Sequence, residues 1–260
     1  MRFDVITLFP ELFAPFLSSG VTRRAYESGS VDVKLWNPRD FADGNYRRVD
    51  DRPFGGGPGM VMLAEPLALC LAAIRVERVS ACDPVVLFSP VGATLNHTAV
   101  EGWSASGGAV LICGRYEGID QRFIDTFVTH QISLGDFVLS GGEIAAMALL
   151  DAVARLQPGV LNDEGSHQLD SFNPALDGLL DCPHYTRPEA WQGLTVPAEL
   201  MSGNHAHIER WRRDQRLHIT QQARPELVAK ARAAGHLDAK DEAVLTALAQ
   251  KASAQSGQLL

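Results

Sequence analysis

Short apolar runs alternate with helical patterns along the first 160 residues of this chain. Runs rich in Val, Ile, Leu and Phe predict β-strands at residues 2–8, 31–36, 84–88, 109–113 and 127–134. Apolar residues at helical spacing predict helices between or after these runs, at about 10–18, 20–28, 65–78, 96–104, 119–125 and 142–156. Strands that alternate with helices are joined by crossover connections. The pattern therefore predicts an α/β fold, in which a parallel sheet is covered by helices on both faces.

The pattern changes beyond this region. Residues 158–178 are rich in Asp, Asn, Ser and Gly and have no clear periodicity, which indicates a linker. Residues 196–256 are largely helical in pattern. We therefore expect three parts: a domain over residues 1–160, a linker over 161–175 and a small helical domain over 176–260.

Polar stretches with glycine follow three of the predicted strands, as FSPVG at 88–92, GRYEG at 114–118 and LGDFVLSGG at 134–142. In an open α/β sheet, ligands bind beyond the carboxyl ends of the strands, and glycine lets the backbone approach a ligand closely. One such stretch is more often a tight turn, but three in succession favour a binding crevice. None has the GxGxxG or GxxxxGK[ST] pattern, which argues against a nicotinamide cofactor or a nucleoside triphosphate.

A fourth polar and glycine-rich stretch occupies residues 38–59 and is long for a connection inside a compact domain. Its DRPFGGGPGM segment at 51–60 lacks the lysine and the hydroxyl residue of a phosphate-binding loop. Potential metal ligands occur as Cys182 with His184 and as His205 with His207. Their CxH and HxH spacing does not match the usual structural zinc patterns, so we do not assign a metal to them.

Composition places the chain among ordinary globular proteins, with 46% hydrophobic and 21% charged residues. No apolar run approaches the roughly 20 residues that span a bilayer, and the N-terminus lacks the features of a secretory signal. The four cysteines form no CxxC pair and are interpreted as reduced thiols. We therefore expect a cytoplasmic protein without a membrane partner.

The formal charge of −8 argues at first against a nucleic-acid partner, but the charge is unevenly distributed. Between residues 205 and 232 seven basic residues stand against three acidic ones. Because salt screens exposed charges beyond about 8 Å, a local basic face can bind phosphate on an acidic protein. A solvated, arginine-rich helix is the more common explanation of such a run. Both interpretations, a phosphate-binding face and a solvated helix, stay open here.

Six longer motifs make a resemblance recognisable: VDDRPFGGGPGM, CGRYEGID, GDFVLSGGE, DSF, LLDCPHYTRPE and SGNHAHIERWR. Together they resemble the bacterial tRNA (guanine-N1)-methyltransferases, the TrmD family of the SPOUT superfamily. The similarity runs from LFPELF near the N-terminus to about residue 230. The resemblance implies a deep trefoil knot in the first domain and a homodimer with a composite active site. It also implies S-adenosylmethionine as cofactor, a helical second domain that grips tRNA, and methylation of N1 of the guanosine at tRNA position 37. Activity in this family depends on magnesium, for which the sequence indicates no position.

The resemblance also assigns residues. The cofactor-binding residues that it implies are Ser89, Pro90, Gly92, Gly114, Arg115, Tyr116, Glu117, Leu134, Gly135, Asp136, Phe137, Val138, Leu139, Gly141 and Gly142. The RNA-binding residues that we expect are Asp50, Arg52, Gly55, Gly57, Gly59, Arg210, Arg212, Arg213 and Arg216. Two positions depart from the common family pattern: Phe137 stands where many members have Tyr, and Ala145 replaces a frequent Pro.

The implied catalytic residues are Asp170 in the DSF motif, Arg155 and Glu117. N1 of guanine keeps its proton at neutral pH, so a carboxylate within hydrogen-bond reach is needed to remove it. Negative charge then develops on the neighbouring carbonyl oxygen, where a fixed guanidinium stabilises it. Without the motif, a helix N-cap would be the preferred interpretation of Asp170.

Two alternatives to this function remain at the level of the sequence. Another SPOUT methyltransferase with a different RNA target would share the three glycine stretches but not DRPFGGGPGM or DSF. A noncatalytic RNA-binding protein would account for the basic run, but it leaves the three stretches and Asp170 unexplained.

Overall fold

The computed structural model describes residues 1–78, 83–162 and 167–256. The chain forms two compact units, Met1–Asn162 and Asp163–Leu260. The predicted linker over 161–175 spans the division between them, and its residues 163–166 lie outside the described residues.

A parallel five-stranded sheet forms the centre of the first unit. Its strands are β1 (Arg2–Ile6), β2 (Asp32–Trp36), β5 (Val85–Thr94), β6 (Gly108–Ile112) and β7 (His130–Ser133). They lie in the order β2-β1-β6-β5-β7, and every neighbouring pair is parallel. The predicted parallel sheet is therefore confirmed, with a strand in each of the five predicted segments.

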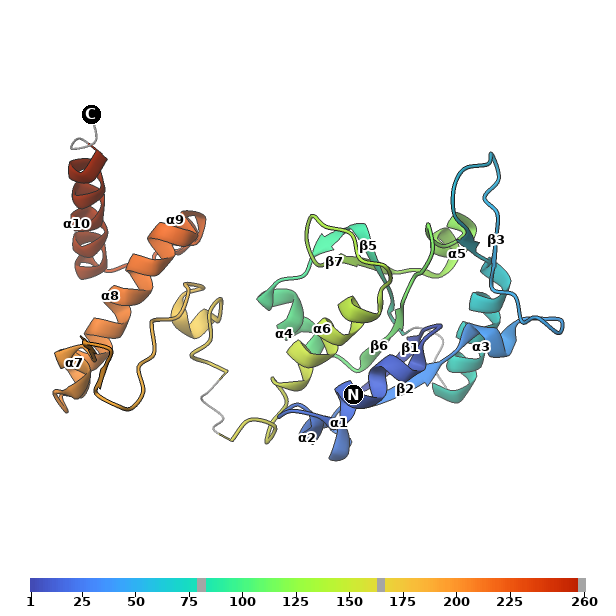
Figure 1. The fold of residues 1–260 in the computed structure, drawn as a ribbon, viewed down its shortest axis with the longest axis horizontal. Coiled ribbons are helices and arrows are strands. Elements are labelled where there is room, and N and C mark those ends of the chain that lie inside the picture. The colour runs from blue at the N-terminus through green and yellow to red at the C-terminus, as the bar shows by residue number, and fades with distance from the viewer. Residues whose placement is uncertain (79–82, 163–166, 257–260) are drawn as a thin grey trace. The chain divides into compact units, whose positions relative to one another are not determined.

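Helices cover both faces of this sheet (Figure 1). One face packs against α1 (Phe13–Ser18), α2 (Arg23–Glu27), α4 (His97–Ser104) and α6 (Glu143–Ala154). The other face packs against α3 (Ala64–Arg78) and α5 (Gln121–Phe127). The alternation of side chains along β6 explains why both layers are needed: Ala109 and Leu111 enter the first core, and Val110 and Ile112 enter the second.

Strand β5 is longer than predicted and irregular. The sequence pattern ends this strand at residue 88, whereas the structure continues it to Thr94. Phe88 and Ala93 both pair with Ile132 of β7, so the residues between them leave the ladder and return to the same partner. The FSPVG stretch is thus a local excursion from a strand and not its end, which apolar patterning alone could not reveal.

The long stretch after β2 is ordered against the sheet. It contains the short helix η2 (Pro38–Phe41) and an antiparallel pair of strands, β3 (Asp50–Asp51) and β4 (Val61–Met62). The amide of Met62 donates to the carbonyl of Gly118 at 2.9 Å, and the amide of Glu117 donates to the carbonyl of Met60 at 2.9 Å. These hydrogen bonds fix the stretch beside the loop that follows β6.

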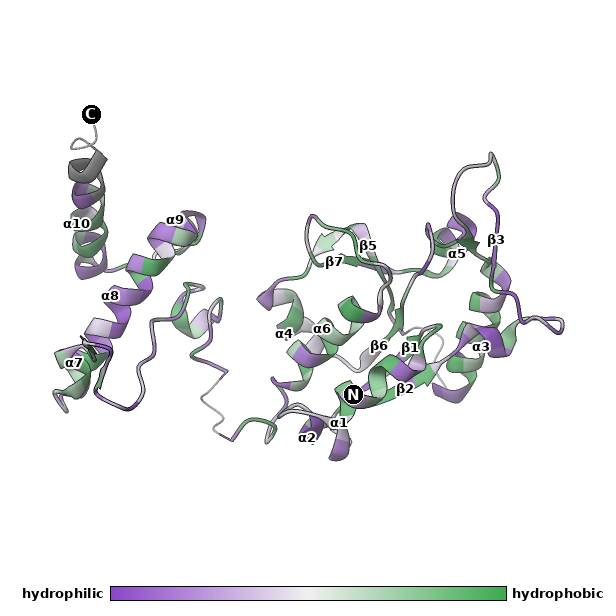
Figure 2. Ribbon diagram, viewed as in Figure 1, coloured by the Kyte–Doolittle hydropathy of each residue, from purple (hydrophilic) through white to green (hydrophobic). Residues whose placement is uncertain are grey.

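The second unit is mostly helical. Its elements are η3 (Pro174–Leu176), the strand pair β8 (Ala190–Trp191) and β9 (Leu194–Thr195), and the helices α7 (Ala198–Met201), α8 (His205–Ala223), α9 (Pro225–Ala233) and α10 (Ala239–Ser256). Helix α8 begins where the Asn204 side chain accepts hydrogen bonds from two backbone amides. A small core contains Leu179, Leu217, Val228 and Leu245. Helix α8 is hydrophilic over much of its surface (Figure 2). Among the described residues, no helix is long and apolar enough to cross a membrane.

Candidate functional site

A pocket of about 280 Å³ lies beyond the carboxyl ends of β6 and β7, beside the excursion of β5 between Phe88 and Ala93. We call it the glycine-loop pocket, because the glycine-containing segments that follow β6 and β7 form most of its lining, together with Ser89 and Pro90 of the β5 excursion. Most of the residues predicted to bind a cofactor line it: Ser89, Pro90, Gly114, Arg115, Tyr116, Glu117, Leu134, Gly135, Phe137, Val138, Leu139, Gly141 and Gly142. The structure thus brings together segments that lie far apart in the sequence, from Ser89 to Gly142.

Two of the predicted cofactor residues do not line this pocket. Gly92 packs against the backbone of β7, where an added Cβ would lie 2.4 Å from the carbonyl carbon of Gln131. Asp136 is exposed to solvent. The apolar floor of the pocket was missed by sequence reasoning and includes Leu87, Ile119 and Ile132. Leu87 and Ile132 look like ordinary core positions in the sequence because they lie within apolar strands, and Ile119 is a single apolar residue between β6 and α5.

Neighbouring atoms lie so close to residues 141 and 142 that only glycine fits at these two positions. The amide of Gly142 donates to the carbonyl of Gly114 at 3.0 Å. A Cβ added to Gly142 would lie 2.8 Å from Cα of Cys113, and one added to Gly141 would lie 2.2 Å from Nε of Arg115. A side chain at Gly142 would collide with the backbone of the loop after β6, and one at Gly141 would collide with the side chain of Arg115.

A buried ion pair ties the pocket walls together. A guanidinium nitrogen of Arg115 lies 2.9 Å from a carboxylate oxygen of Glu143, whose side chain is 1% exposed. The other oxygen of Glu143 accepts a hydrogen bond from the Thr7 hydroxyl at 2.9 Å. Arg115 also donates to the carbonyl of Ser140 at 3.2 Å and lies over the ring of Phe9. A charge in such a dry position is tolerable only because it is paired and hydrogen-bonded.

This Arg115–Glu143 network links the end of β1, the loop after β6 and the start of α6. Sequence reasoning included Arg115 but missed Glu143 and Thr7. The available signal was Glu143 itself, an acidic residue at the start of a helix that is otherwise apolar for its first two turns. An acid placed there needs a buried partner.

The predicted RNA-binding stretch at residues 50–59 lies against Glu117, the predicted catalytic residue of the pocket. A Cβ added to Gly59 would lie 2.4 Å from Cγ of Glu117, so the two loops touch at this glycine. Partial burial, and after it the negative charge of Asp50, raise the pKa of Tyr116. The structure therefore brings Asp50 and Gly59 next to Tyr116 and Glu117 of the glycine-loop pocket, whereas Arg52, Gly55 and Gly57, which lie between them in the sequence, are exposed.

The two remaining candidate catalytic residues belong to different units. Arg155 is half-buried and follows the last turn of α6, where its amide donates to the carbonyl of Asp151. Asp170 is half-buried in a turn of the second unit. It does not cap a helix: the capping position of η3 belongs to Asn173, whose side chain accepts from the amide of Ala175. The N-cap interpretation of Asp170 is therefore wrong.

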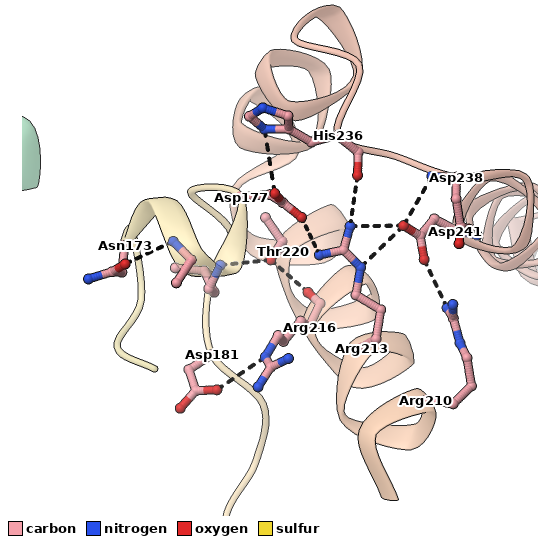
Figure 3. Close-up of polar contacts among 12 residues, drawn as sticks. Asn173, Asp177, Asp181, Arg210, Arg213, Arg216, Thr220, His236, Asp238 and Asp241 are labelled. Atoms are coloured by element: carbon pink, nitrogen blue, oxygen red, sulfur yellow. Dashed lines mark hydrogen bonds and ion pairs between the residues drawn. The ribbon is translucent and has the colours of Figure 1, made fainter. Parts of the chain in front are cut away.

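Three of the four predicted tRNA-binding arginines of α8, Arg210, Arg213 and Arg216, have the carboxylate partners within the second unit that Figure 3 shows. Arg213 contacts Asp177 at 2.6 Å and Asp241 at 2.8 Å, and Arg210 contacts Asp241 at 3.0 Å. Burial alone would raise the pKa of Asp241, but hydrogen bonds from Arg213 and Arg210 lower it below its usual value. Asp241 is thus an ionised, buried hub between α8 and α10.

The other two arginines of the prediction differ from each other. Arg216 is buried and lies 3.4 Å from a carboxylate oxygen of Asp181. Arg212 pairs with Glu209 one turn away, and the two side chains are 42% and 61% exposed. Such an exposed pair contributes about 0–1 kcal/mol. This arrangement favours a structural role for Arg213 and Arg216, while phosphate binding by the four arginines stays a prediction.

The described cysteines are buried, and one group of possible metal ligands lies close together. Cys70, Cys113 and Cys182 are buried free thiols, and Cys82 lies outside the described residues. Burial raises the pKa of Cys113 well above its usual value. Within the described ranges, one group could hold a metal ion, formed by Asp181, Cys182 and His184. Burial also raises the pKa of the Cys182 thiol, which disfavours the thiolate that a metal requires.

Comparison with known proteins agrees with this geometry. The profile of the family described as "tRNA (Guanine-1)-methyltransferase TrmD" matches residues 1–230. A protein of Polaromonas sp. (strain JS666 / ATCC BAA-500) named tRNA (guanine-N(1)-)-methyltransferase is 78% identical over 251 residues, which cover 95% of this chain and 97% of that protein. Proteins of the same name from Paracidovorax citrulli (strain AAC00-1) and Bordetella pertussis (strain Tohama I / ATCC BAA-589 / NCTC 13251) are 73% and 55% identical, over 95% and 96% of this chain and 98% of each relative. The glycine loops, the hairpin stretch beside them and these matches lead to one conclusion: the chain belongs to the tRNA (guanine-1)-methyltransferase TrmD family.

Proposed function

We propose that the glycine-loop pocket binds S-adenosylmethionine and that the methyl group is transferred to N1 of the guanosine at position 37 of tRNA. Family membership and the high identity to named relatives make tRNA (guanine-N1)-methyltransferase the activity of this chain. The proposal concerns the cofactor pocket, the position on tRNA and the residues that act. The observation that carries it is the convergence of the implied cofactor residues on one pocket.

The pocket fits the proposed cofactor in shape and chemistry. Gly114, Gly135, Gly141 and Gly142 line it without side chains, which leaves room for an adenine ring beside their backbone. Leu87, Ile119 and Ile132 supply an apolar floor. When bound, S-adenosylmethionine supplies an electrophilic methyl group on a sulfonium ion. Backbone groups of Gly114, Leu134, Gly135 and Leu139 would hold the adenine and sulfonium ends, and the Arg115–Glu143 network would keep these loops in place.

In the proposed reaction, Asp170 accepts the proton of guanine N1, and Arg155 stabilises the negative charge that develops on the adjacent oxygen. A guanidinium is suited to the second task because it stays charged and presents several donors in a fixed plane. Glu117, held beside Gly59, would orient the reacting end. Loss of one such charge-stabilising donor typically costs about 3–4 kcal/mol of the barrier.

We further propose the trefoil knot that the family resemblance implies. Two features support it. The segment around Gly92 presses on the backbone of β7, and the segment around Gly142 presses on the backbone at Cys113, both without room for a Cβ. Close passage of chain segments of this kind is needed where one segment threads another.

The proposal includes a homodimer, in which the loops of one subunit face Asp170 of the other, and a helical second unit that binds tRNA. It also includes a cytoplasmic location, where tRNA is modified. Magnesium is proposed from the family alone. Among the described residues, the one candidate metal group includes a thiol, and magnesium prefers oxygen ligands. The described part of the chain therefore shows no cage for magnesium, and no step above depends on the ion.

Incubation of the full chain with a tRNA transcript and S-adenosylmethionine, followed by mass spectrometry of nuclease fragments, tests the proposal. We expect N1-methylguanosine at position 37. A methyl group elsewhere would support another SPOUT activity, and tRNA binding without methyl transfer would support a noncatalytic RNA-binding protein.

The Asp170→Asn variant tests the assignment of the base. Methyl transfer should fall by at least about 1000-fold, with S-adenosylmethionine affinity within twofold of wild type, because Asp170 does not line the glycine-loop pocket. If calorimetry shows cofactor affinity falling in step with activity, Asp170 is not the base.

Mixed dimers test the composite site. Asp170→Ala subunits mixed with Gly142→Ala subunits should regain part of the activity, since one of the two sites then has both intact parts. No recovery at any ratio, with subunit exchange verified, contradicts a shared site.

A further inference from the structure

We propose that a second pocket, in the C-terminal unit, binds an unpaired nucleobase of the tRNA; this inference rests on the proposed tRNA substrate. The pocket has a volume of about 270 Å³ and lies between residues 183–185, Val196 and the helices α7 and α8. We call it the aromatic pocket. Its lining residues are Pro183, His184, Tyr185, Val196, Leu200, Ile208, Trp211 and Arg212.

The walls of the aromatic pocket suit a flat, uncharged ring. The rings of Tyr185 and Trp211 lie 6.1 Å apart and are inclined by 63°, so the edge of one ring points toward the face of the other. Tyr185 is 49% exposed, which leaves part of its ring open to a ligand. Val196, Leu200 and Ile208 complete an apolar surface. Bases stack on such aromatic side chains with little dependence on sequence, because every base has a π-face.

The rim of the aromatic pocket suits the phosphate attached to a base. Arg212 belongs to the lining, and its partner Glu209 is an exposed residue one turn away. Little free energy is lost when Arg212 exchanges this partner for a phosphate, which binds a guanidinium strongly. Arg213 and Arg216 lack this freedom, since Asp177, Asp241 and Asp181 already hold them (Figure 3). His184 also lies at the rim, with a side chain that is 79% exposed and with its Nε2 at 2.9 Å from a carboxylate oxygen of Asp181.

A nucleobase explains this combination better than a second copy of the chain does. A stable protein interface covers roughly 800 Å² on each partner and has few charges at its centre. The aromatic pocket offers a small cavity with an arginine and a histidine among its lining residues. An aromatic, apolar floor with a cationic rim is the combination that proteins use for single-stranded nucleic acid.

Binding of an unmodified tRNA transcript to full-length variants tests this inference. We expect Tyr185→Leu and Trp211→Leu to weaken tRNA binding about 5- to 100-fold, the range of one lost stacking contact. Trp211→Phe, which keeps an aromatic ring, should stay within about threefold of wild type. The matched control is Trp191→Leu, which removes an exposed tryptophan of the same unit that does not line the pocket and should leave the dissociation constant unchanged. Cofactor affinity should be the same in all four.

The outcomes separate the competing explanations. If a folded Tyr185→Leu or Trp211→Leu variant binds tRNA with wild-type affinity, the inference is overturned. It is also overturned if the loss of tRNA affinity is accompanied by a changed sedimentation coefficient of the variant protein, because the pocket would then hold a second subunit. Equal losses in Trp191→Leu and Trp211→Leu would also overturn it. Circular dichroism establishes folding, and Tyr185→Leu removes the more exposed ring if Trp211→Leu fails to fold. Failure of the proposed function is seen separately, as a wild-type protein that does not methylate guanine N1.

Discussion

The glycine-loop pocket and helix α8 both concentrate unusual residues, and they use them in opposite ways. In the pocket, Gly141 and Gly142 have no side chains, so the loop after β7 packs directly against the loop after β6 and both line one cavity. On α8, arginines meet carboxylates of the same unit, so most of their charge is already neutralised. The pocket thus depends on the absence of side chains at its glycines, whereas most of the arginines of α8 already form ion pairs within their own unit.

The difference lies in how each region satisfies polar groups that folding removes from water. The pocket hides a single ion pair, Arg115 with Glu143, and that pair faces the loops it must hold. The second unit has a small apolar core, so several of its inter-element contacts are ion pairs such as those of Asp241. The following four predictions test this contrast, from the largest expected effect to the smallest.

Replacing Glu143 with Leu should have the largest effect. The change leaves the Arg115 guanidinium, which is 19% exposed, without its partner, and breaking a buried pair costs about 3–5 kcal/mol of unfolding free energy. Urea denaturation measures this loss. In the double variant Arg115→Met with Glu143→Leu most of the stability should return, because no buried charge remains, while cofactor affinity should stay low. If the double variant binds S-adenosylmethionine normally, the pair does not hold the loops.

Replacing Gly142 with Ala should weaken cofactor binding next in order. The new methyl group would lie 2.8 Å from Cα of Cys113, so one of the two loops must move. Overpacking of this kind costs about 1–3 kcal/mol, which corresponds to a rise of about 5- to 150-fold in the dissociation constant of S-adenosylmethionine. Calorimetry measures it. The control is Gly102→Ala, at an exposed position of α4 with open space around it, where we expect slightly higher stability and unchanged affinity.

Replacing Asp241 with Asn should destabilise the second unit by about 2 kcal/mol at pH 7, because Arg210 and Arg213 lose a charged acceptor. The pKa of Asp241 is lowered in the folded state. Its stabilising effect is therefore complete above the unfolded pKa, near 4, and is lost as the pH falls through the folded value. The difference between wild type and variant in thermal unfolding should shrink below about pH 4. A difference that stays constant from pH 7 to pH 2 would show that the charge of Asp241 contributes nothing.

Much of the first unit could be predicted from the sequence, for reasons that particular residues make clear. Strand segments such as Ala109–Cys113 are continuous apolar runs, as strands covered on both faces require. The convergence of the glycine stretches followed from parallel order, because the carboxyl ends of parallel strands meet at one edge of a sheet. The excursion between Phe88 and Ala93 could not be predicted, since it depends on both residues pairing with Ile132.

At the glycine-loop pocket and on α8, the side-chain partners that are far apart in the sequence could not be predicted. Thr7 meets Glu143 across 136 residues, and Arg213 meets Asp177 across 36. Neither partner is marked by local spacing, because the three-dimensional fold alone brings them together. The run of arginines in the sequence therefore predicted that α8 is rich in positive charge. It could not predict which of these guanidinium groups form ion pairs with carboxylates of the same unit.

Removing the exposed ion pair between Arg212 and Glu209 should have the smallest effect on stability. It also tests most directly whether an arginine of α8 is available to tRNA. Arg212→Gln should change the unfolding free energy by no more than about 0.5 kcal/mol, since both side chains are open to solvent. If Arg212 contacts a tRNA phosphate, the slope of log K against log salt should become shallower by roughly 0.7–0.9. Arg122→Gln, which removes an arginine with a 79% exposed side chain from the first unit, is the control and should leave the slope unchanged. An unchanged slope in Arg212→Gln would mean that this arginine too serves only its own helix, and the tRNA contacts of the protein would then have to be sought in the stretch that carries Asp50 and Arg52.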